Sequence, residues 1–415
     1  MGERDASPSS ARPRLGPLES ARAVRERCEA VYAEGLAGRL EHWRIDLGAM
    51  AHVIDRVLRV TAEAYPDPRA IPYHSRWRHF GAGGVDRIAR LDARLASVDD
   101  DERLASRMDL VVTSVLLDAG AGERWVYRDA QGRAFARSEG LAVASHDVFV
   151  AGAFSSNPAT APLRADGEAL ARTDAQVLAA GFQIDAGNPL VGLDGRAALL
   201  RRLGERVQGA PFYFAHPDGR SPARLGHIGA RLRQSADGGA VAASAVLDAV
   251  LGALGPIWAR ADAAGGQPPG DVWTHSRLGG VPFHKLSQWL TYSLCEPLEW
   301  SGLRVTGLEA LTGLAEYRNG GLFVDGGVLV PARAEALGEV HAVGSDLVIE
   351  WRALTVALLD RVAQGVREGL GLSEDELPLA RVLEGGTWRA GRAIAAEKRA
   401  GGAPPLRIAS DGTVF

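Results

Sequence analysis

The chain has 415 residues, of which 46% are hydrophobic, and its formal net charge is −4, from 47 basic and 51 acidic side chains. This size and composition predict a globular protein with a substantial core, and the near balance of charge gives no electrostatic basis for binding nucleic acid. The two cysteines, Cys28 and Cys295, exclude a disulfide framework and a cysteine zinc site. No run approaches the ~18 apolar residues that span a bilayer, and the N-terminus has no signal-peptide pattern. We therefore expect a cytoplasmic protein that does not contact a membrane.

Most of the chain has the apolar spacing of helices. Residues 1–17 are rich in Ser, Pro and Arg without such spacing, which predicts a disordered tail. Residues 18–415 predict a single large, mainly helical unit, and if it divides into two lobes the junction is expected near 205–240, a stretch rich in Gly and Pro. The clearest helical patterns cover Leu18–Ala64, Leu110–Leu117, Leu190–Leu203, Val241–Leu254, Phe283–Leu294 and Trp351–Leu370.

Local signals predict where some of these elements begin and turn. Ser138 is expected to cap a helix whose first turn contains Glu139, and Thr387 is expected to cap the last helix. The sequence LFVDGGVLV is typical of a short β-hairpin turned at Asp325-Gly326-Gly327.

The strongest candidate site lies in residues 281–327. Within the predicted helix, Lys285, Gln288 and Tyr292 share one polar side. A compact string follows, in which an acid, a phenol, a guanidinium and an amide precede two glycines: Glu316, Tyr317, Arg318 and Asn319. The chain has 45 Arg and only two Lys, so a lysine retained at position 285 suggests a need for a compact ammonium.

Further candidates come from earlier segments. Asp118 precedes a glycine-rich turn and Trp125, Glu139 lies in a predicted first helical turn, and Arg76 lies in a polar aromatic loop. Each has an alternative interpretation: Asp118 as a helix-end residue, Glu139 as a charge that favours a helix N-terminus, and Lys285 as a surface lysine. Two further alternatives are that Glu316 and Arg318 form a structural ion pair and that His74 and His79 are polar loop residues.

No motif for nucleophilic or metal catalysis appears. The chain has no G-x-S-x-G, H-E-x-x-H or C-x-x-C sequence, which leaves acid/base hydrolysis without a metal or cofactor. In such a site one carboxylate activates water, and cations hold a phosphate or carboxylate of the substrate.

Several long strings resemble the uracil-catabolism protein family of fungi and bacteria. They include SVLLDAGAG, RSEGLAVAS, NPLVGLDGR, PFHKLSQWLTYSL, LTGLAEYRNGGLFVD and VLEGGTWRAGR, and the similarity extends from about residue 20 to the end. The resemblance implies a role in a pathway in which uracil is ribosylated and its ring is opened by a cyclohydrolase-like enzyme. A urea attached to ribose remains after that step. The cyclohydrolase-like enzyme is accordingly an expected functional partner.

A fainter similarity connects the chain to the queuosine-salvage nucleotide glycosidases, which implies a large helical domain of the DNA-glycosylase-like type with short β-hairpins. The shared pattern is matched by Phe283, His284, Lys285 and Gln288, and then by Ala315, Glu316, Tyr317 and Arg318. The chain departs from it in two ways, because Glu316 replaces an aspartate and Ser293 stands where the relatives have another acid. A small leaving group such as urea fits both changes.

Together these observations predict hydrolysis of the N-glycosidic bond of ribosylurea 5′-phosphate, or of a related ring-opened pyrimidine ribotide, to urea and ribose 5-phosphate. The expected catalytic carboxylate is Glu316, supported by Asp118 and Glu139. Two alternatives stay open, an amidohydrolase that acts on the ureido group and a non-catalytic partner of the cyclohydrolase. The expected substrate-binding residues are Lys285, Gln288, Tyr292, Tyr317, Arg318, Asn319, Arg76 and Trp125.

Overall fold

The computed structural model of the protein describes residues 15–216, 221–258 and 270–409. The tail predicted over residues 1–17 lies almost entirely outside these ranges. The α-helices are α1 (Ala21–Leu36), α2 (Met50–Ala64), α3 (Trp77–Phe80), α4 (Arg87–Arg94), α5 (Asp100–Leu116), α6 (Arg137–Val150), α7 (Gly167–Ala171), α8 (Ala175–Gly181), α9 (Leu193–Gly209), α10 (Pro211–Phe214), α11 (His227–Gln234), α12 (Ala243–Leu254), α13 (Lys285–Trp300), α14 (Tyr317–Asp325), α15 (Asp346–Leu370), α16 (Leu379–Val382) and α17 (Trp388–Lys398). The strands are β1 (Trp43–Ile45), β2 (Tyr127–Arg128), β3 (Ala134–Phe135), β4 (Ala240–Ala242), β5 (Val272–His275), β6 (Gly279–Pro282), β7 (Arg304–Thr306), β8 (Leu329–Pro331), β9 (Val340–Ala342) and β10 (Arg407–Ala409).

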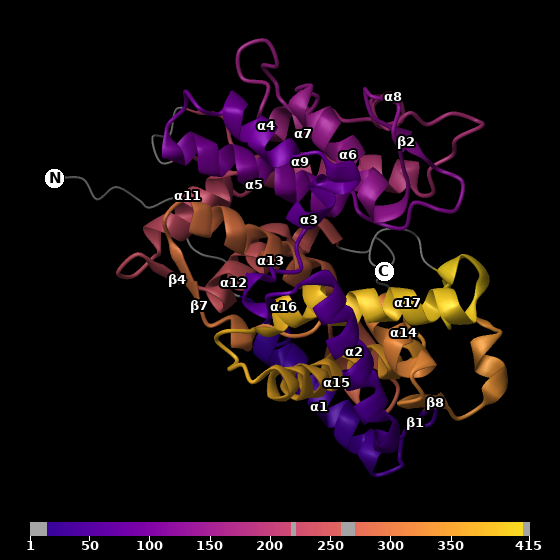
Figure 1. Ribbon diagram of the computed structural model, residues 1–415. Helices are drawn as coiled ribbons and strands as arrows, with labels where there is room; N and C mark the ends of the chain where they lie inside the picture. The colour runs from indigo at the N-terminus through magenta and orange to yellow at the C-terminus, as the bar shows by residue number, and fades with distance from the viewer. Residues whose placement is uncertain (1–14, 217–220, 259–269, 410–415) are drawn as a thin grey trace.

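The helices form two bodies that meet across the middle of the molecule (Figure 1). Helices α4 to α9 make the upper body, and α1, α2, α14, α15 and α17 make the lower one, so the lower body combines both ends of the chain. Helix α1 packs along α15, and α2 packs against α15 and α17. Helix α13 lies at the centre and contacts both α5 and α12. The predicted mainly helical class is confirmed, whereas the junction expected near 205–240 stays a prediction. Among the described helices, none has the length and apolar composition that a membrane crossing requires.

The strands pair two by two, and most pairs connect distant segments. In the described part of the chain β1–β8, β2–β3 and β5–β6 are antiparallel, and β4–β7 and β9–β10 are parallel. The hairpin predicted at residues 325–327 is wrong. Its first half belongs to helix α14, which ends at Asp325 with Gly326 as its C-cap, and Gly327 then turns the chain with a φ of 81°. The segment before the turn is helical, so the strand that follows, β8, has no adjacent strand to pair with and pairs with β1 instead.

The predicted cap at Ser138 is wrong, and Thr387 stands at the predicted N-cap position of α17 but makes no side-chain capping bond. Helix α6 begins two residues earlier than expected, at Arg137, so Ser138 lies inside its first turn. Helix α17 continues directly from a π-helical turn, so Thr387 has a helical backbone, and its hydroxyl donates to the Asn319 side chain at 3.0 Å. Both hydroxyls form tertiary hydrogen bonds, which the local sequence pattern does not reveal.

A proline in the central helix explains how the segment before α3 docks. Helix α13 is buried over Ser287–Leu298 and contains Pro297, which has no N–H. The carbonyl oxygen of Ser293, four residues earlier, therefore has no helical donor. Trp77 Nε1 donates to this oxygen at 2.7 Å, and the backbone N–H of Arg76 donates to the Ser293 hydroxyl at 3.0 Å. These two bonds fix Arg76 at the centre of the molecule.

Replacing Trp77 by phenylalanine is expected to lower the free energy of unfolding by about 1–3 kcal/mol, because the buried Ser293 carbonyl loses its donor. The substitution Pro297→Ala returns an N–H at the correct spacing, so Trp77→Phe should cost less in that background. Unfolding by guanidinium chloride of the wild-type protein, both single variants and the double variant measures the difference. Equal costs in the two backgrounds would show that the indole contributes by packing alone.

Candidate functional site

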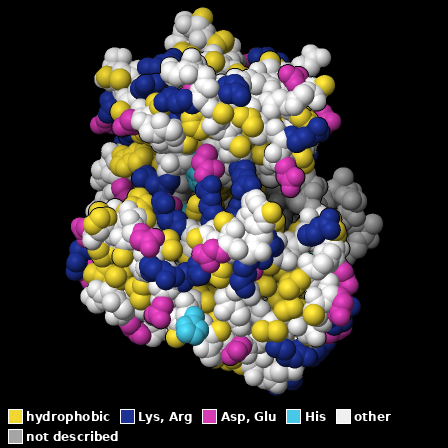
Figure 2. All heavy atoms as spheres, turned by 45° about the vertical axis from the view of Figure 1, so that its right-hand side comes forward, with side chains coloured by type: hydrophobic (Ala, Val, Ile, Leu, Met, Phe, Trp, Pro, Cys, Tyr) yellow, Lys and Arg dark blue, Asp and Glu magenta, His cyan; other side chains and the backbone are white. Residues whose placement is uncertain are grey.

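A pocket of about 570 Å³ lies where the two bodies meet. Its upper wall is the end of α5 and the start of α6, with Asp118 and Ser138, and its lower wall contains Lys285 of α13 and Tyr317 and Arg318 of α14. Figure 2 shows Lys and Arg side chains gathered in the hollowed waist between the bodies. Four predicted site residues, from segments far apart in the sequence, thus line one pocket.

Glu316 lies beside this pocket at the start of α14. It is the N-cap residue, and its two carboxylate oxygens accept hydrogen bonds from the backbone N–H groups of Arg318 at 2.8 Å and Asn319 at 2.6 Å. Burial raises the pKa of Glu316, and these two donors and the Lys285 ammonium oppose the rise. The Glu316 side chain is half-buried, and the next two residues, Tyr317 and Arg318, line the pocket.

The alternative of a structural ion pair between Glu316 and Arg318 is not what the structure contains. The Arg318 guanidinium donates to the carbonyl oxygen of Gly402 at 3.1 Å and lies 4.9 Å from the centre of the Tyr317 ring. Helix α17 approaches closely here, because a Cβ at Gly391 would lie 2.2 Å from the Arg318 carbonyl oxygen. The glycine therefore sets the position of the start of α14.

Asp118 is the partner of Arg76. The Asp118 carboxylate lies 3.0 Å from Nη1 of Arg76 and accepts a hydrogen bond from the Ser138 hydroxyl at 3.1 Å. Arg76 is wholly buried, and its Nε donates to Ser114 Oγ at 2.7 Å. Arg76 is one of the predicted substrate-binding residues, and its pairing with Asp118 fixes the orientation of that carboxylate in the pocket wall.

Lys285 is the first residue of α13. The residue before it, His284, has a φ of 47°, and the Lys285 backbone N–H donates to Asp271 at 3.0 Å. Asp271 is held in turn by both Nη atoms of Arg352, each at 2.7 Å. Within the described residues no carboxylate lies within ion-pair distance of the Lys285 ammonium, which therefore offers its charge to the pocket.

Four predicted substrate-binding residues are buried and use their polar groups within the protein. Gln288 binds the backbone N–H and the hydroxyl of Thr312 at 2.9 and 2.6 Å, and Tyr292 donates to the Thr312 carbonyl at 3.1 Å. Asn319 donates to the Leu314 carbonyl at 3.3 Å. They hold the loop that carries Glu316, so they position the site without lining the pocket. The fourth, Trp125, is wholly buried and donates to the carbonyl of Phe182 at 2.9 Å.

Four aromatic rings that the sequence analysis did not select meet next to Arg76. This ring cluster consists of His74, His79, Trp289 and Trp388. The Trp289 ring lies 6.4 Å from His74 and 5.9 Å from His79, and the Trp388 ring lies 6.1 and 6.4 Å from the same two rings, measured between centroids. The signal for Trp289 was present, because it lies one turn after Lys285. His74 and His79 had been interpreted as polar loop residues.

The charges around the ring cluster are balanced. His74 Nδ1 lies 2.9 Å from a carboxylate oxygen of Glu384, and Glu139, in the first turn of α6 as predicted, lies 3.1 Å from Arg392. Burial and the nearby Arg76 guanidinium lower the pKa of His79 to about 4. The His79 imidazole is therefore neutral at neutral pH.

Glu296, in the last turn of α13, is a buried carboxylate that accepts a hydrogen bond from Ser75 and pairs with Arg78. Burial raises its pKa from 4.5 to about 7. The folded protein thus keeps a proton that the unfolded chain releases between about pH 4.5 and 7, so this group makes stability fall as pH rises through that window. We expect a smaller fall in Glu296→Gln, measured by guanidinium chloride unfolding at about pH 5 and pH 8. An unchanged pH dependence would contradict the raised pKa.

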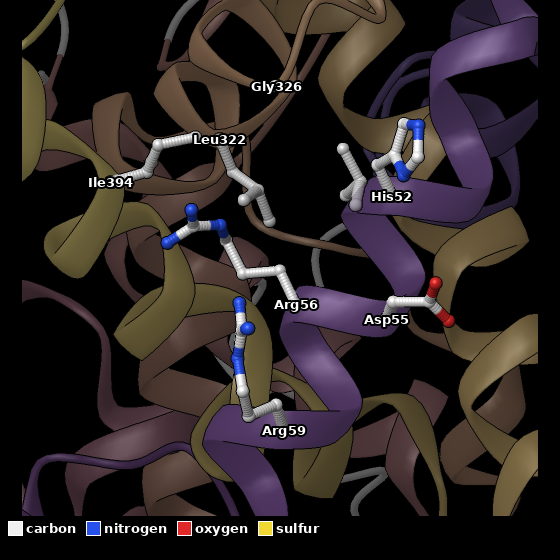
Figure 3. A pocket seen from close by; sticks show the side chains of 8 residues that line it. His52, Asp55, Arg56, Arg59, Leu322, Gly326 and Ile394 are labelled. Carbon is white, nitrogen blue, oxygen red and sulfur yellow. The ribbon is translucent and has the colours of Figure 1, made fainter.

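A second pocket of about 390 Å³ lies between α2, α14 and α17 (Figure 3). Arg56 and Arg59 extend from α2 to one side of it, and Asp55 points the other way. Arg56 is bound to Glu397 at 2.8 and 3.0 Å. None of the predicted site residues lines this pocket. We therefore assign the candidate site to the first pocket, where carboxylates and cations from several helices converge. In the described ranges no group of three or more His, Cys, Asp and Glu side chains is placed to hold a metal ion.

Comparison with known proteins gives matches along almost the whole chain. A family model described as a protein of unknown function (DUF1688) matches residues 17–415. Protein urg3 of Schizosaccharomyces pombe is 39% identical over 414 residues, which cover 97% of this chain and 99% of that protein. Uracil catabolism protein 4 of Lachancea kluyveri is 36% identical over 435 residues, which cover 96% of this chain and 98% of that protein.

Proposed function

The chain belongs to the DUF1688 family, as its sequence led us to expect. On this basis we propose that it acts in uracil catabolism as an N-glycosidase. Its substrate is ribosylurea 5′-phosphate or a related ring-opened pyrimidine ribotide, and its products are urea and ribose 5-phosphate. The name of the Lachancea kluyveri relative supports the pathway. One observation carries the reaction: an acid of raised pKa, Glu316, lies beside a pocket that also contains a guanidinium, a second carboxylate and the Lys285 ammonium, which has no ion-pair partner among the described residues.

Glu316 is the proposed catalytic carboxylate. Breaking the bond between C1′ of ribose and the urea nitrogen develops positive charge on the sugar, and a nearby carboxylate stabilises that charge. The same carboxylate takes a proton from water, whose oxygen bonds to C1′ as the bond from C1′ to the urea nitrogen breaks. The departing nitrogen takes one proton from solvent and Glu316 returns its own to solvent, so one water is consumed. The raised pKa of Glu316 supports this role, because a general base works best when its pKa approaches the working pH.

The two cations of the lower wall suit the 5′-phosphate. Lys285 and Arg318 both line the pocket, and within the described residues the Nε of Arg318 has no hydrogen-bond partner. Phosphate oxygens accept hydrogen bonds from both kinds of side chain. Across the pocket, the Asp118 carboxylate is an acceptor for ribose hydroxyls, and its orientation is fixed by Arg76 and Ser138. The size of the pocket is in the range of small-molecule sites.

The direct test is incubation of the purified protein with synthetic ribosylurea 5′-phosphate. We expect equal amounts of urea and ribose 5-phosphate, measured by a urea assay and by chromatography. Release of ammonia with the glycosidic bond intact would indicate an amidohydrolase instead. Binding without any product would indicate the non-catalytic role, and either result would overturn the proposal.

A further inference from the structure

The ring cluster of His74, His79, Trp289 and Trp388 has hydrogen-bonding groups that the protein leaves unused. Among the buried nitrogen atoms of the described residues that have no hydrogen-bond partner, three belong to this cluster and the adjacent Arg76: Nη2 of Arg76, Nε1 of Trp289 and Nδ1 of His79. Arg76 is wholly buried, and the exposed fraction of Trp289 is 5%. Buried donors without partners are unfavourable, and most native proteins satisfy them. Three such atoms around adjoining aromatic rings indicate a place for a ligand.

The chemistry of these atoms limits what that ligand is. An indole N–H and a guanidinium N–H only donate hydrogen bonds, and a neutral imidazole nitrogen donates or accepts. The ligand must therefore present an acceptor oxygen to Arg76 and Trp289. The Arg76 guanidinium lies over the Trp289 ring, 5.7 Å from its centre, so the two donors lie close enough together for one small acceptor group to face both.

The charges around the cluster exclude a phosphate. Arg76 is already paired with Asp118, and Arg392 with Glu139. His74 is bound to Glu384. Because these cations are already paired, a dianion placed here would have its charge opposed by the nearby carboxylates, whereas a neutral carbonyl needs only the donors. The cluster thus differs from the pocket wall that contains Lys285.

The position of Glu316 connects the two regions. Lys285 and His74 both lie close enough to the Glu316 carboxylate to lower its pKa. Lys285 belongs to the pocket wall and His74 to the ring cluster. A ligand that contacts both the pocket wall and the ring cluster would therefore lie near Glu316.

We propose that the ring cluster and Arg76 bind the planar, carbonyl-bearing ureido group of the substrate, the group that leaves when the glycosidic bond breaks. The carbonyl oxygen accepts hydrogen bonds from Arg76 and Trp289, and the flat group lies among the four rings. The inference rests on the proposed function for the identity of the sugar phosphate at the other end. It assigns recognition of the leaving group to residues separate from those that hold the phosphate.

The test measures binding of the two halves of the substrate separately, with probes that the enzyme does not convert. Uracil and methylurea carry the planar carbonyl group, and ribose 5-phosphate carries the sugar phosphate. Ligand-observed NMR titration gives their dissociation constants. Trp289→Phe keeps an aromatic ring but removes the N–H, so we expect uracil and methylurea to bind about tenfold more weakly, and ribose 5-phosphate to bind within twofold of its wild-type affinity. Lys285→Met should show the reverse pattern.

A matched control is Trp300→Phe, the same change on the same helix but at a side chain 42% exposed and outside the cluster, which should alter neither affinity. If Trp289→Phe is poorly folded by circular dichroism, Trp388→Leu, at a half-buried wall of the cluster, provides the same comparison. The inference is overturned if the wild-type protein binds neither uracil nor methylurea, or if the cluster variants weaken both halves equally. These outcomes are independent of the urea-release assay, so the failure of one proposal can be separated from the failure of the other.

Discussion

Replacing Glu316 by glutamine should lower kcat for urea release by about 10²–10⁴-fold, the effect of removing a general base or a charge-stabilising carboxylate. Glutamine retains one oxygen that can accept a hydrogen bond from the start of α14, so the cap is weakened but the helix should still form. Steady-state kinetics with ribosylurea 5′-phosphate measure the effect, and thermal unfolding followed by circular dichroism reports whether the fold persists.

The control for this variant is Glu316→Asp. Aspartate is a good N-cap residue and keeps the carboxylate, one methylene further from the substrate. We expect activity between that of the wild-type protein and that of the glutamine variant. If the glutamine variant is folded and retains more than about a tenth of the wild-type kcat, Glu316 is a cap and is not the catalytic residue.

Replacing Lys285 by methionine is expected to raise KM for the phosphorylated substrate by about 10- to 100-fold, which corresponds to losing a hydrogen bond to a charged group. Methionine retains much of the length and packing of the lysine stem but has no charge. Because the ammonium is proposed to contact only the 5′-phosphate, KM for unphosphorylated ribosylurea should change little. The comparison of the two substrates therefore assigns the effect to the phosphate.

The second lysine of the chain provides the matched control. Lys398 is exposed at the end of α17, and Lys398→Met should leave both KM values unchanged. Equal losses with both substrates in Lys285→Met would contradict a phosphate contact. Such a result would indicate that the residue supports the start of α13 instead.

The sequence predicted individual segments well where the signal was local. The helical spacing of Val241–Leu254 and Trp351–Leu370 corresponds to α12 and α15, each within a few residues of its observed start. The hairpin at residues 325–327 was wrong, because a pair of glycines ends a helix as readily as it turns two strands. The partner that decides between the two, β1, lies almost 300 positions earlier.

The candidate site was predicted in part. Lys285, Tyr317, Arg318 and Asp118 line one pocket, although nothing in their spacing indicates that Asp118 faces the other three. The polar side expected for the predicted helix 283–294 was misleading in a different way. The polar ends of Gln288 and Tyr292 form hydrogen bonds inside the protein with Thr312, a residue from another segment. Burial of a polar side chain depends on its neighbours in space, which helical spacing does not specify.

By itself the sequence determined the mainly helical class, the family and the residues with reactive groups, because helical spacing and contiguous motifs are properties of short stretches. Only the tertiary structure decided which of these groups meet. Pro297 leaves the Ser293 carbonyl without a helical donor, and Trp77 donates a hydrogen bond to it. This contact places the neighbouring Arg76 between Asp118 and the ring cluster. Unpaired donors and raised pKa values arise from burial among residues distant in the chain. The proposed division of the site into a cationic wall and an aromatic cluster therefore follows only from the folded structure.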